Sequence, residues 1–240
     1  MKIYFFDTET TGNTPTDRLC QLAVKELGVA RPLVNEYYKP PMPIPFEASA
    51  VHHISNKMVA DKPAFTESPR YVEIKALFES PDTYVVAHNA AFDVGMLEAE
   101  GITPTHVICT YKVVRHLDTD GAFAMHKLQY LRYALSMELD VSAHDAFADV
   151  LVLEQLFAYL HKKIMDERAL DDAAALALME NLTSTPCLIR EFTFGKYKGK
   201  TLEEVALTAP DYLEWLLGQK EQAPAGEEDW LYTLKHYLKR

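Results

Sequence analysis

The stretch FFDTETTG, residues 5–12, ends the first apolar run of the chain with two carboxylates separated by one threonine. Residues Lys2–Phe6 are typical of a buried strand, and side chains two positions apart on a strand lie on the same face. Asp7 and Glu9 are therefore expected to lie side by side, where each raises the pKa of the other. The motif alone also fits a solvated strand end, but the apolar residues before it favour a buried pair that binds divalent cations.

A second acidic motif, HNAAFD, follows the apolar segment Thr83–Ala87, which is typical of another strand. Asn89 is predicted to cap a helix over 90–100, and this places Asp93 in the first turn, where the helix dipole favours an anion. His88 is interpreted as a residue that shapes the turn by hydrogen bonding. Taken alone, the motif fits a structural helix start as well as it fits a functional site.

A third motif, HDAFADV, begins an amphipathic helix that is predicted over 145–161. Asp145 is the expected cap of this helix, whereas Asp149 shares a face with the apolar Ala146 and is expected to turn inward. His144 precedes the helix, so its imidazole can lean over a site to which Asp149 contributes. A capped helix with a surface histidine is the competing interpretation.

The order of the predicted elements indicates the fold class. Three strands follow one another closely at first, as in an antiparallel meander, and later strands alternate with helices. This order favours an α/β layered domain with a mixed sheet, and residues 47–55 are expected to form a loop. The predicted strands cover 2–6, 19–27, 33–38, 83–87 and 106–110, and the predicted helices cover 56–60, 67–79, 90–100, 127–138 and 145–161.

Three parts are predicted along the chain. Residues 1–165 form the α/β domain, residues 166–188 form a helix and a linker, and residues 189–240 form a small α+β module. The linker is indicated by the segment TSTP. Trp215 and Trp230 are expected to anchor the core of the last module.

The module opens with FTFGKYKGK, residues 192–200, whose alternation is typical of a strand. A strand would line Lys196, Lys198 and Lys200 on one face. These lysines either grip a nucleic-acid backbone or protect an exposed hairpin edge, and both interpretations stay open here.

Composition limits the class of partner. The chain has 240 residues, of which 48% are apolar and 25% charged, as in ordinary globular proteins. The net charge of −11 excludes a protein that binds nucleic acid through bulk charge alone, so any such binding must be local. Three widely spaced cysteines match no metal motif and indicate reduced thiols in a cytoplasmic protein. No signal peptide or membrane-spanning run is recognised, so a membrane is not an expected partner.

Together the three motifs supply four carboxylates and one histidine at strand ends and helix starts, where open α/β sheets build their sites. Four acidic groups in one cleft favour two divalent cations, and such a pair suits phosphodiester hydrolysis. His144 is the candidate general base, because an imidazole titrates close to neutral pH.

In this order, FDTETTG, HNAAFD and HDAFAD resemble the three exonuclease motifs of the DEDDh 3'–5' exonucleases, over roughly residues 2–160. The resemblance implies a ribonuclease H-like fold, two Mg²⁺ or Mn²⁺ ions, and release of nucleoside 5'-monophosphates from 3' ends. It implies His144 as the base. The metal ligands that it implies are Asp7, Glu9, Asp93 and Asp149.

The segment EASAVHHIS is similar to the part of these enzymes that cradles the terminal nucleotide. Substrate contacts are thereby implied for Thr10, Thr11, Val51 and His52. The stretch after Gly12, NTPTDRLCQ, is longer and more polar than the exodeoxyribonuclease X type leads us to expect, so the end preference stays open. The C-terminal segments FTFGKYKGKTLEEVALTAPDYLEWLL and TLKHYL resemble the C-terminal region of that type.

The sequence therefore predicts a metal-dependent 3'–5' exodeoxyribonuclease that acts on DNA 3' ends in repair or end trimming. An RNA-trimming exonuclease with the same site is one alternative. A polymerase proofreading subunit, whose tail docks on a repair or polymerase protein, is another. A nucleic-acid-binding scaffold without activity is the non-enzymatic alternative, and the oligomeric state stays open.

Overall fold

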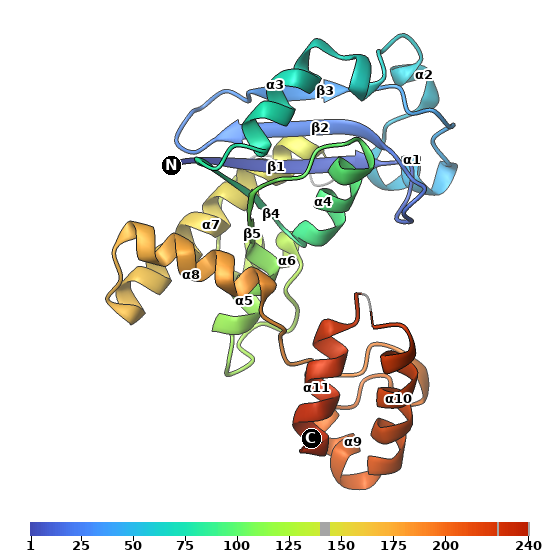
Figure 1. Cartoon of the computed structure of the whole chain (residues 1–240), viewed down its shortest axis with the longest axis vertical. Coiled ribbons are helices and arrows are strands. Elements are labelled where there is room, and N and C mark those ends of the chain that lie inside the picture. The colour runs from blue at the N-terminus through green and yellow to red at the C-terminus, as the bar shows by residue number, and fades with distance from the viewer. Residues whose placement is uncertain (140–144, 225, 240) are drawn as a thin grey trace. The chain divides into compact units, whose positions relative to one another are not determined.

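The computed structural model describes residues 1–139, 145–224 and 226–239. The chain forms two compact units, Met1–Thr183 and Ser184–Arg240 (Figure 1). Each unit has an apolar core of its own, so the two are described separately. Among the described residues, no helix combines the length and the apolar composition that a bilayer span requires.

A five-stranded mixed sheet forms the centre of the first unit, with the strand order β3-β2-β1-β4-β5 (Figure 1). The first three strands pair antiparallel, which confirms the predicted meander, and β4 and β5 extend the sheet in parallel with β1. The predicted mixed α/β class is therefore correct. The strands are β1 (Lys2–Thr10), β2 (Leu19–Glu26), β3 (Val34–Tyr37), β4 (Thr83–Ala87) and β5 (His106–Cys109).

Helices cover both faces of this sheet. Neither α1 nor α5 was predicted: α1 occupies a segment that was expected to be a loop, and α5 begins directly at the end of β5 without a turn residue to mark its start. The elements are α1 (Phe46–His52), α2 (Asn56–Val59), the 3-10 helix η1 (Phe65–Glu67), α3 (Pro69–Phe78), α4 (Ala90–Ala99), α5 (Thr110–Leu117), α6 (Leu128–Ala134), α7 (Ala146–Arg168) and α8 (Asp172–Ser184).

Alternation along β1 distributes its side chains between two cores, one on each face of the sheet. Phe5 packs edge-to-face on Phe157 of α7, with 5.3 Å between the ring centroids. Phe6 points to the opposite face and meets Phe78 of α3 at 5.2 Å. Because Asp7 follows Phe5 by two positions, it lies on the face that α7 covers. Burial of each such ring contributes about 1.5–3 kcal/mol to folding. The contact between Phe5 and Phe157 therefore holds α7 against β1.

Helix α7 is longer than predicted and ends at Arg168, because Ala169 adopts a left-handed conformation with a φ of 51°. The helix predicted at the start of 166–188 is thus divided between α7 and α8. Residues 166–188 were predicted to form a helix and a linker that follow the α/β domain. In the structure, α8 instead packs into the first unit. Its buried residues in that core are Ala175, Leu176 and Met179.

The turn from β4 into α4 depends on Asn89, whose φ of 64° and ψ of 45° are left-handed. Asparagine visits this region more readily than most residues. Asn89 occupies the predicted N-cap position of α4, but its side chain makes no capping hydrogen bond. The left-handed residue redirects the chain within one step, and Asp93 consequently lies in the first turn of α4.

The second unit is helical, with η2 (Gly195–Tyr197), α9 (Leu202–Thr208), α10 (Pro210–Gln222) and α11 (Glu228–Leu238). Its core surrounds the fully buried Phe192. Trp230 packs on Phe192 with 5.5 Å between ring centroids, as predicted for a core anchor. Trp215 is 56% exposed, so its predicted core role is wrong.

The segment FTFGKYKGK does not form the predicted strand. Gly195 and Gly199 have φ values of 70° and 84°, which fold the segment into consecutive turns. Alternation of side chains between two faces requires extended backbone. Lys196, Lys198 and Lys200 are therefore not aligned on one strand face, and that prediction is wrong.

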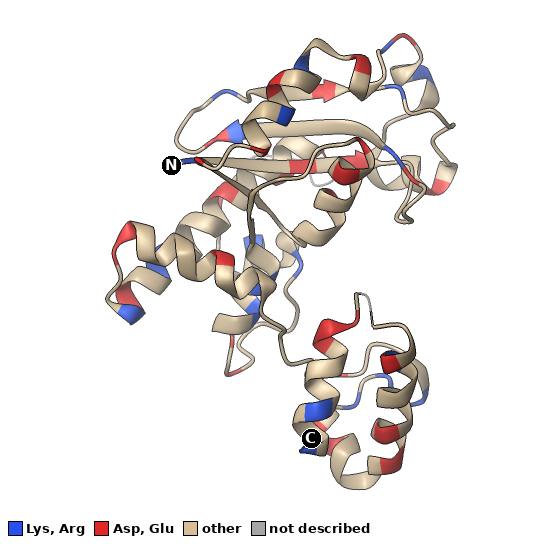
Figure 2. Cartoon of the chain, in the orientation of Figure 1, with Lys and Arg blue, Asp and Glu red and all other residues tan. Residues whose placement is uncertain are grey.

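Acidic side chains are unevenly divided between the two units (Figure 2). Residues 1–183 contain 26 Asp and Glu against 16 Lys and Arg, whereas residues 184–240 contain nine against eight. The first unit accordingly carries almost all of the net negative charge, and the second is nearly neutral.

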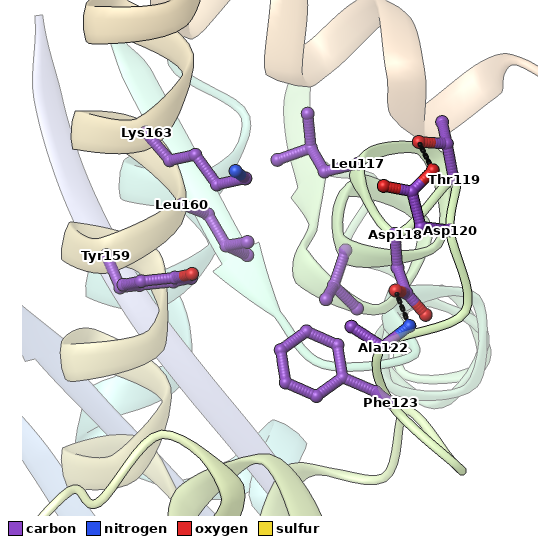
Figure 3. Close-up of a pocket in the computed structure, with 10 residues that line it drawn as sticks. Leu117, Asp118, Thr119, Asp120, Ala122, Phe123, Tyr159, Leu160 and Lys163 are labelled. Atoms are coloured by element: carbon purple, nitrogen blue, oxygen red, sulfur yellow. Dashed lines mark hydrogen bonds between the residues drawn. The ribbon is translucent and has the colours of Figure 1, made fainter.

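A cavity of about 180 Å³ lies between α7 and the end of α5 (Figure 3). Tyr159, Leu160 and Lys163 of α7 line one side, and Leu117 and Phe123 line the other. None of the four predicted metal ligands is among its lining residues, so the cavity is distinct from the candidate site.

Candidate active site

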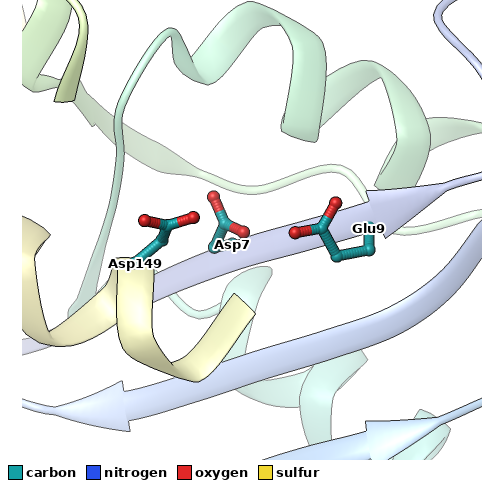
Figure 4. Close-up of side chains that lie close together, drawn as sticks. All are labelled: Asp7, Glu9 and Asp149. Carbon is teal, nitrogen blue, oxygen red and sulfur yellow. The ribbon is translucent and has the colours of Figure 1, made fainter. Parts of the chain in front are cut away.

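Three of the predicted acidic residues converge at the end of β1 (Figure 4). Asp7 and Glu9 come from β1, and Asp149 comes from the first turn of α7. One carboxylate oxygen of each lies within 4.8 Å of the others. An all-carboxylate donor set of this size suits a hard divalent cation such as Mg²⁺ or Mn²⁺.

Asp145 fixes the start of α7 beside this cluster. Its carboxylate accepts hydrogen bonds from the backbone N–H groups of Phe147 and Ala148, each at 3.1 Å, as expected for an N-cap. Asp149 then follows one helical turn later and turns inward, where it is 8% exposed. The cap and the inward-pointing residue are therefore two different aspartates, as the sequence suggested.

Asp93 reaches the site across the open edge of β1. Strand β4 pairs with β1 only as far as the Phe5–Val86 pair and then turns away into α4. Beyond that point, Asp93 Oδ1 accepts hydrogen bonds from the backbone N–H of Thr8 at 3.1 Å and from its hydroxyl at 2.7 Å. The Asp93 carboxylate thus binds the Thr8 backbone N–H, which a longer β4 would otherwise pair. The charge of Asp93 also raises the pKa of Asp7.

The carboxyl groups resist ionisation in the absence of a cation. Burial, together with the charges of Asp149 and Asp93, raises the pKa of Glu9 to about 8. Burial raises the pKa of Asp93 to about 7, although its hydrogen bonds from Thr8 oppose this. The pKa of Asp7 rises well above its ordinary value, first through burial and then through its acidic neighbours. Such a cluster fits a site where divalent cations compensate the charge.

Gln129 of α6 also belongs to this site, and the sequence analysis did not find it. Its side-chain amide donates a hydrogen bond to Asp149 Oδ1. Arg132, one turn further along α6, lies with its guanidinium 3.4 Å from Gln129 Oε1. A glutamine on an amphipathic helix carries no sequence signal, because its contact with Asp149 arises only when α6 packs on α7.

His52 and Thr10, for which the resemblance implied substrate contacts, lie beside each other in the structure. His52 is buried, and its Nδ1 accepts a hydrogen bond from the backbone N–H of Ile54 at 3.0 Å. The proton of the neutral ring is therefore on Nε2, which donates to the Thr10 carbonyl at 3.2 Å. Burial lowers the pKa of His52 and keeps the ring neutral. Val51 beside it is 52% exposed and available to a ligand.

The polar stretch after Gly12 is an ordered turn built on Asp17. The Asp17 carboxylate accepts hydrogen bonds from the Thr11 hydroxyl at 2.8 Å and from the Thr14 backbone N–H at 2.8 Å. A Cβ at Gly12 would lie 2.6 Å from this carboxylate, so a larger residue here would have to displace Asp17 from the turn. Thr11 is buried in this turn and serves to hold it.

The remaining predicted site residues lie elsewhere. His144 lies outside the described residues. Lys196, Lys198 and Lys200 belong to the second unit, where Lys200 is paired with Glu204.

His88 has the hydrogen-bonding role that the sequence predicted. Its Nδ1 lies 2.9 Å from the Thr110 hydroxyl, and its Nε2 donates to the His126 carbonyl at 2.8 Å. Burial lowers the pKa of His88 to about 4, so the ring is neutral and holds the β4–α4 turn rather than acting as a base.

The fold and this carboxylate cluster define a phosphodiester hydrolase. Residues 4–157 match the exonuclease family, which is more than half of the chain, and the chain belongs to that family. Residues 192–221 match the exodeoxyribonuclease X-like C-terminal family.

Individual relatives agree with this class. Exodeoxyribonuclease 10 of Escherichia coli K12 is 29% identical over 236 residues, which are 97% of this chain and 96% of that protein. DNA polymerase III subunit epsilon of Treponema pallidum is 32% identical over 164 residues, covering 63% of this chain and 73% of that protein.

Solved structures agree in fold. Exonuclease X in complex with 5' overhanging duplex DNA has a TM-score of 0.59 and 23% identity, covering 76% of this chain and 99% of that chain. Exonuclease I of Escherichia coli in complex with a dT13 oligonucleotide has a TM-score of 0.56 and 21% identity, covering 69% of this chain and 43% of that chain. The predicted ribonuclease H-like fold is confirmed.

Proposed function

We propose that this protein is a metal-dependent 3'–5' exodeoxyribonuclease that releases nucleoside 5'-monophosphates from DNA 3' ends. The observation that carries the proposal is the convergence of Asp7, Glu9 and Asp149, with Asp93 bound to the adjacent edge of β1. The similarity to exodeoxyribonuclease 10 over nearly the whole chain, including the C-terminal family match, supports DNA as the substrate.

Divalent cations bound at this cluster would stabilise the charge of the scissile phosphate and lower the pKa of the attacking water. Asp7, Glu9, Asp93 and Asp149 would hold two such ions, which we propose to be Mg²⁺ or Mn²⁺. Because Asp7, Glu9 and Asp93 have raised pKa values, these three carboxyl groups would release protons when they take up metal.

A few residues besides the four carboxylates are proposed to take up the proton and to position the reactants. His144 is proposed to accept the proton of the attacking water, as its place just before α7 and the family resemblance suggest. Thr10, Val51 and His52 are proposed to form the wall against the terminal nucleotide. Gln129 orients Asp149 through its hydrogen bond.

We further propose that the enzyme acts in DNA repair or end trimming in the cytoplasm. Its three cysteines, Cys20, Cys109 and Cys187, are buried and lie outside any disulfide, which suits a reducing compartment. A proofreading subunit is the second candidate, favoured by the 32% identity to a polymerase subunit epsilon. The C-terminal family match favours the repair-type enzyme.

The test uses single-stranded DNA, duplex DNA and RNA in Mg²⁺, Mn²⁺ or EDTA. A 5' label should give a ladder of 3'-shortened DNA, and a 3' label should give mononucleotide from the start. Asp7→Ala should abolish the ladder without loss of fold, whereas Asp61→Ala, a control at an exposed aspartate, should retain it. Trimmed RNA with inert DNA would contradict the substrate assignment, and no metal-dependent cleavage would favour the scaffold.

A further inference from the structure

The second unit carries a row of aromatic rings that extends from its core to its surface. The rings of Tyr197 and Tyr212 are 4.7 Å apart, and those of Tyr212 and Trp215 are 5.5 Å apart. Trp215, at the outer end, is 56% exposed. We call Tyr197, Tyr212 and Trp215 the aromatic row.

The core of this unit does not need the outer end of the row. Leu213, Leu216 and Leu217 of α10 are buried, so this helix already has an apolar face against α9 and α11. Trp215 lies on the other side of α10. Gly218, one turn further, has open space within 4 Å of where a Cβ would be, so no described atom covers the helix there. An indole left exposed in this way is available for a flat ligand.

Positive charge accompanies the row. Lys196 lies with its Nζ 5.1 Å from the centre of the Tyr197 ring. In the described part of the chain neither Lys196 nor Lys198 forms an ion pair, whereas Lys200 is paired with Glu204. The uncompensated ammonium group of Lys196 beside a flat ring, with a second lysine outside any described ion pair two residues further on, matches the phosphates and bases of a nucleic-acid strand.

We propose that the aromatic row and Lys196 form a binding surface for single-stranded nucleic acid. Exposed rings stack on bases of any sequence, and this requires bases whose faces are free, which excludes a duplex. The phosphates would lie on the side of Lys196, because α10 carries Asp211 and Glu214. This inference rests on the proposed nuclease function and assigns the second unit the task of retaining the strand.

The charge of the molecule explains why such a surface is needed. The first unit has ten more acidic than basic side chains, so it repels a polyanion except where metal ions are bound. A nearly neutral unit with its own aromatic contacts can hold the strand at a lower electrostatic cost. Stacking is also less sensitive to salt than phosphate contacts are.

The chain offers an internal reporter, because it contains two tryptophans and only Trp215 lies in the row. In full-length Asp7→Ala protein that also carries Trp230→Phe, indole fluorescence comes from Trp215 alone. Titration with oligo(dT) in EDTA should quench this fluorescence saturably. Binding of the oligonucleotide, seen by fluorescence anisotropy, without any change at Trp215 would overturn the proposal.

Affinity gives a second, independent measurement. In the Asp7→Ala background, Trp215→Ala should weaken oligo(dT) binding about 5- to 150-fold. Tyr232→Ala replaces an aromatic that is 46% exposed in the same unit but outside the row, and it should leave affinity unchanged. Equal effects of the two substitutions would contradict the assignment.

The lysines provide a matched pair. Lys196→Gln should weaken binding and reduce the slope of log affinity against log salt by about 0.7, the value for one phosphate contact on a single strand. Lys200→Gln removes a lysine that is already paired with Glu204 and should change neither quantity. If Lys200→Gln has the larger effect, the phosphates do not lie on the side of Lys196 and the proposed binding surface is wrong.

A minimal substrate separates this inference from the proposed function. The nitrophenyl ester of thymidine 5'-monophosphate presents a phosphodiester but no strand to retain. Wild-type protein and Trp215→Ala should hydrolyse it at the same rate. Hydrolysis without Trp215 quenching would refute only the binding surface, whereas quenching without hydrolysis would refute only the nuclease.

Discussion

Replacing Glu9 with glutamine is expected to stabilise the metal-free protein at pH 8, although it removes a proposed metal ligand. Burial and the charges of Asp149 and Asp93 raise the pKa of Glu9 from 4.5 to about 8. The folded state therefore binds this proton more tightly than the unfolded chain does. The stability that Glu9 contributes is full below about pH 4.5 and is lost as the pH rises through about 8.

The size of the effect follows from this rise in pKa. At pH 8 it corresponds to ~4 kcal/mol of lost folding free energy. Glu9 is partly exposed, and solvent screening reduces this figure, so we expect Glu9→Gln to add ~1–3 kcal/mol in EDTA. For a chain of this size that is a rise in melting temperature of about 2–10 °C.

Thermal unfolding followed by circular dichroism tests this in EDTA at pH 8 and pH 5. At pH 5 the gain should nearly vanish, because Glu9 is then protonated in the folded wild-type protein. Saturating Mg²⁺ should reverse the order at pH 8, since the wild-type site binds metal more tightly. Glu98→Gln, at an exposed position of α4, is the control and should change little. An unchanged or lower melting temperature for Glu9→Gln in EDTA at pH 8 would refute the reasoning.

Two further predictions concern contacts that support the site. Gln129→Leu removes the hydrogen bond to Asp149 and should weaken Mn²⁺ binding about 10- to 100-fold, as measured by calorimetry. The control Gln155→Leu, at an exposed position of α7, should leave Mn²⁺ binding unchanged. Equal Mn²⁺ affinity of Gln129→Leu and wild-type protein would show that Gln129 does not orient Asp149. In the wild-type protein the buried Lys25 ammonium lies 2.6 Å from a Glu154 carboxylate oxygen. Glu154→Gln leaves this ammonium without its charge partner and should lower the free energy of unfolding in urea by ~3–5 kcal/mol. The double variant Lys25→Met/Glu154→Leu should recover most of that loss, and no recovery would show that the pair holds β2 to α7 in a way that apolar contacts do not.

Local patterns in the sequence were sufficient for several parts of the site. Period-two alternation placed Asp7 and Glu9 on one face of β1, and cap chemistry distinguished Asp145 from the inward Asp149. The order of strands and helices indicated the mixed sheet. These features depend on residues within one strand or one helical turn, so the sequence contains all the information that they require.

Local patterns failed where the conformation of a single residue or turn decides the outcome. Asn89 lies at the predicted N-cap position but is left-handed and makes no capping bond, and the positive φ values of Gly195 and Gly199 prevent the strand predicted around them. Trp215 lies at the surface although tryptophan usually packs inside. In each case several conformations suit the local sequence, and packing of the surrounding elements selects one.

What the sequence determined by itself was which residue types are available and which of them share a strand face or a helix turn. Only the tertiary structure decided that Asp93 bonds to Thr8, 85 positions away, and that Gln129 bonds to Asp149, 20 positions away. The first contact exists because β4 leaves the edge of β1 open, and the second exists because α6 packs on α7. Both are consequences of how apolar faces are buried together, and burial depends on the whole chain rather than on neighbouring residues.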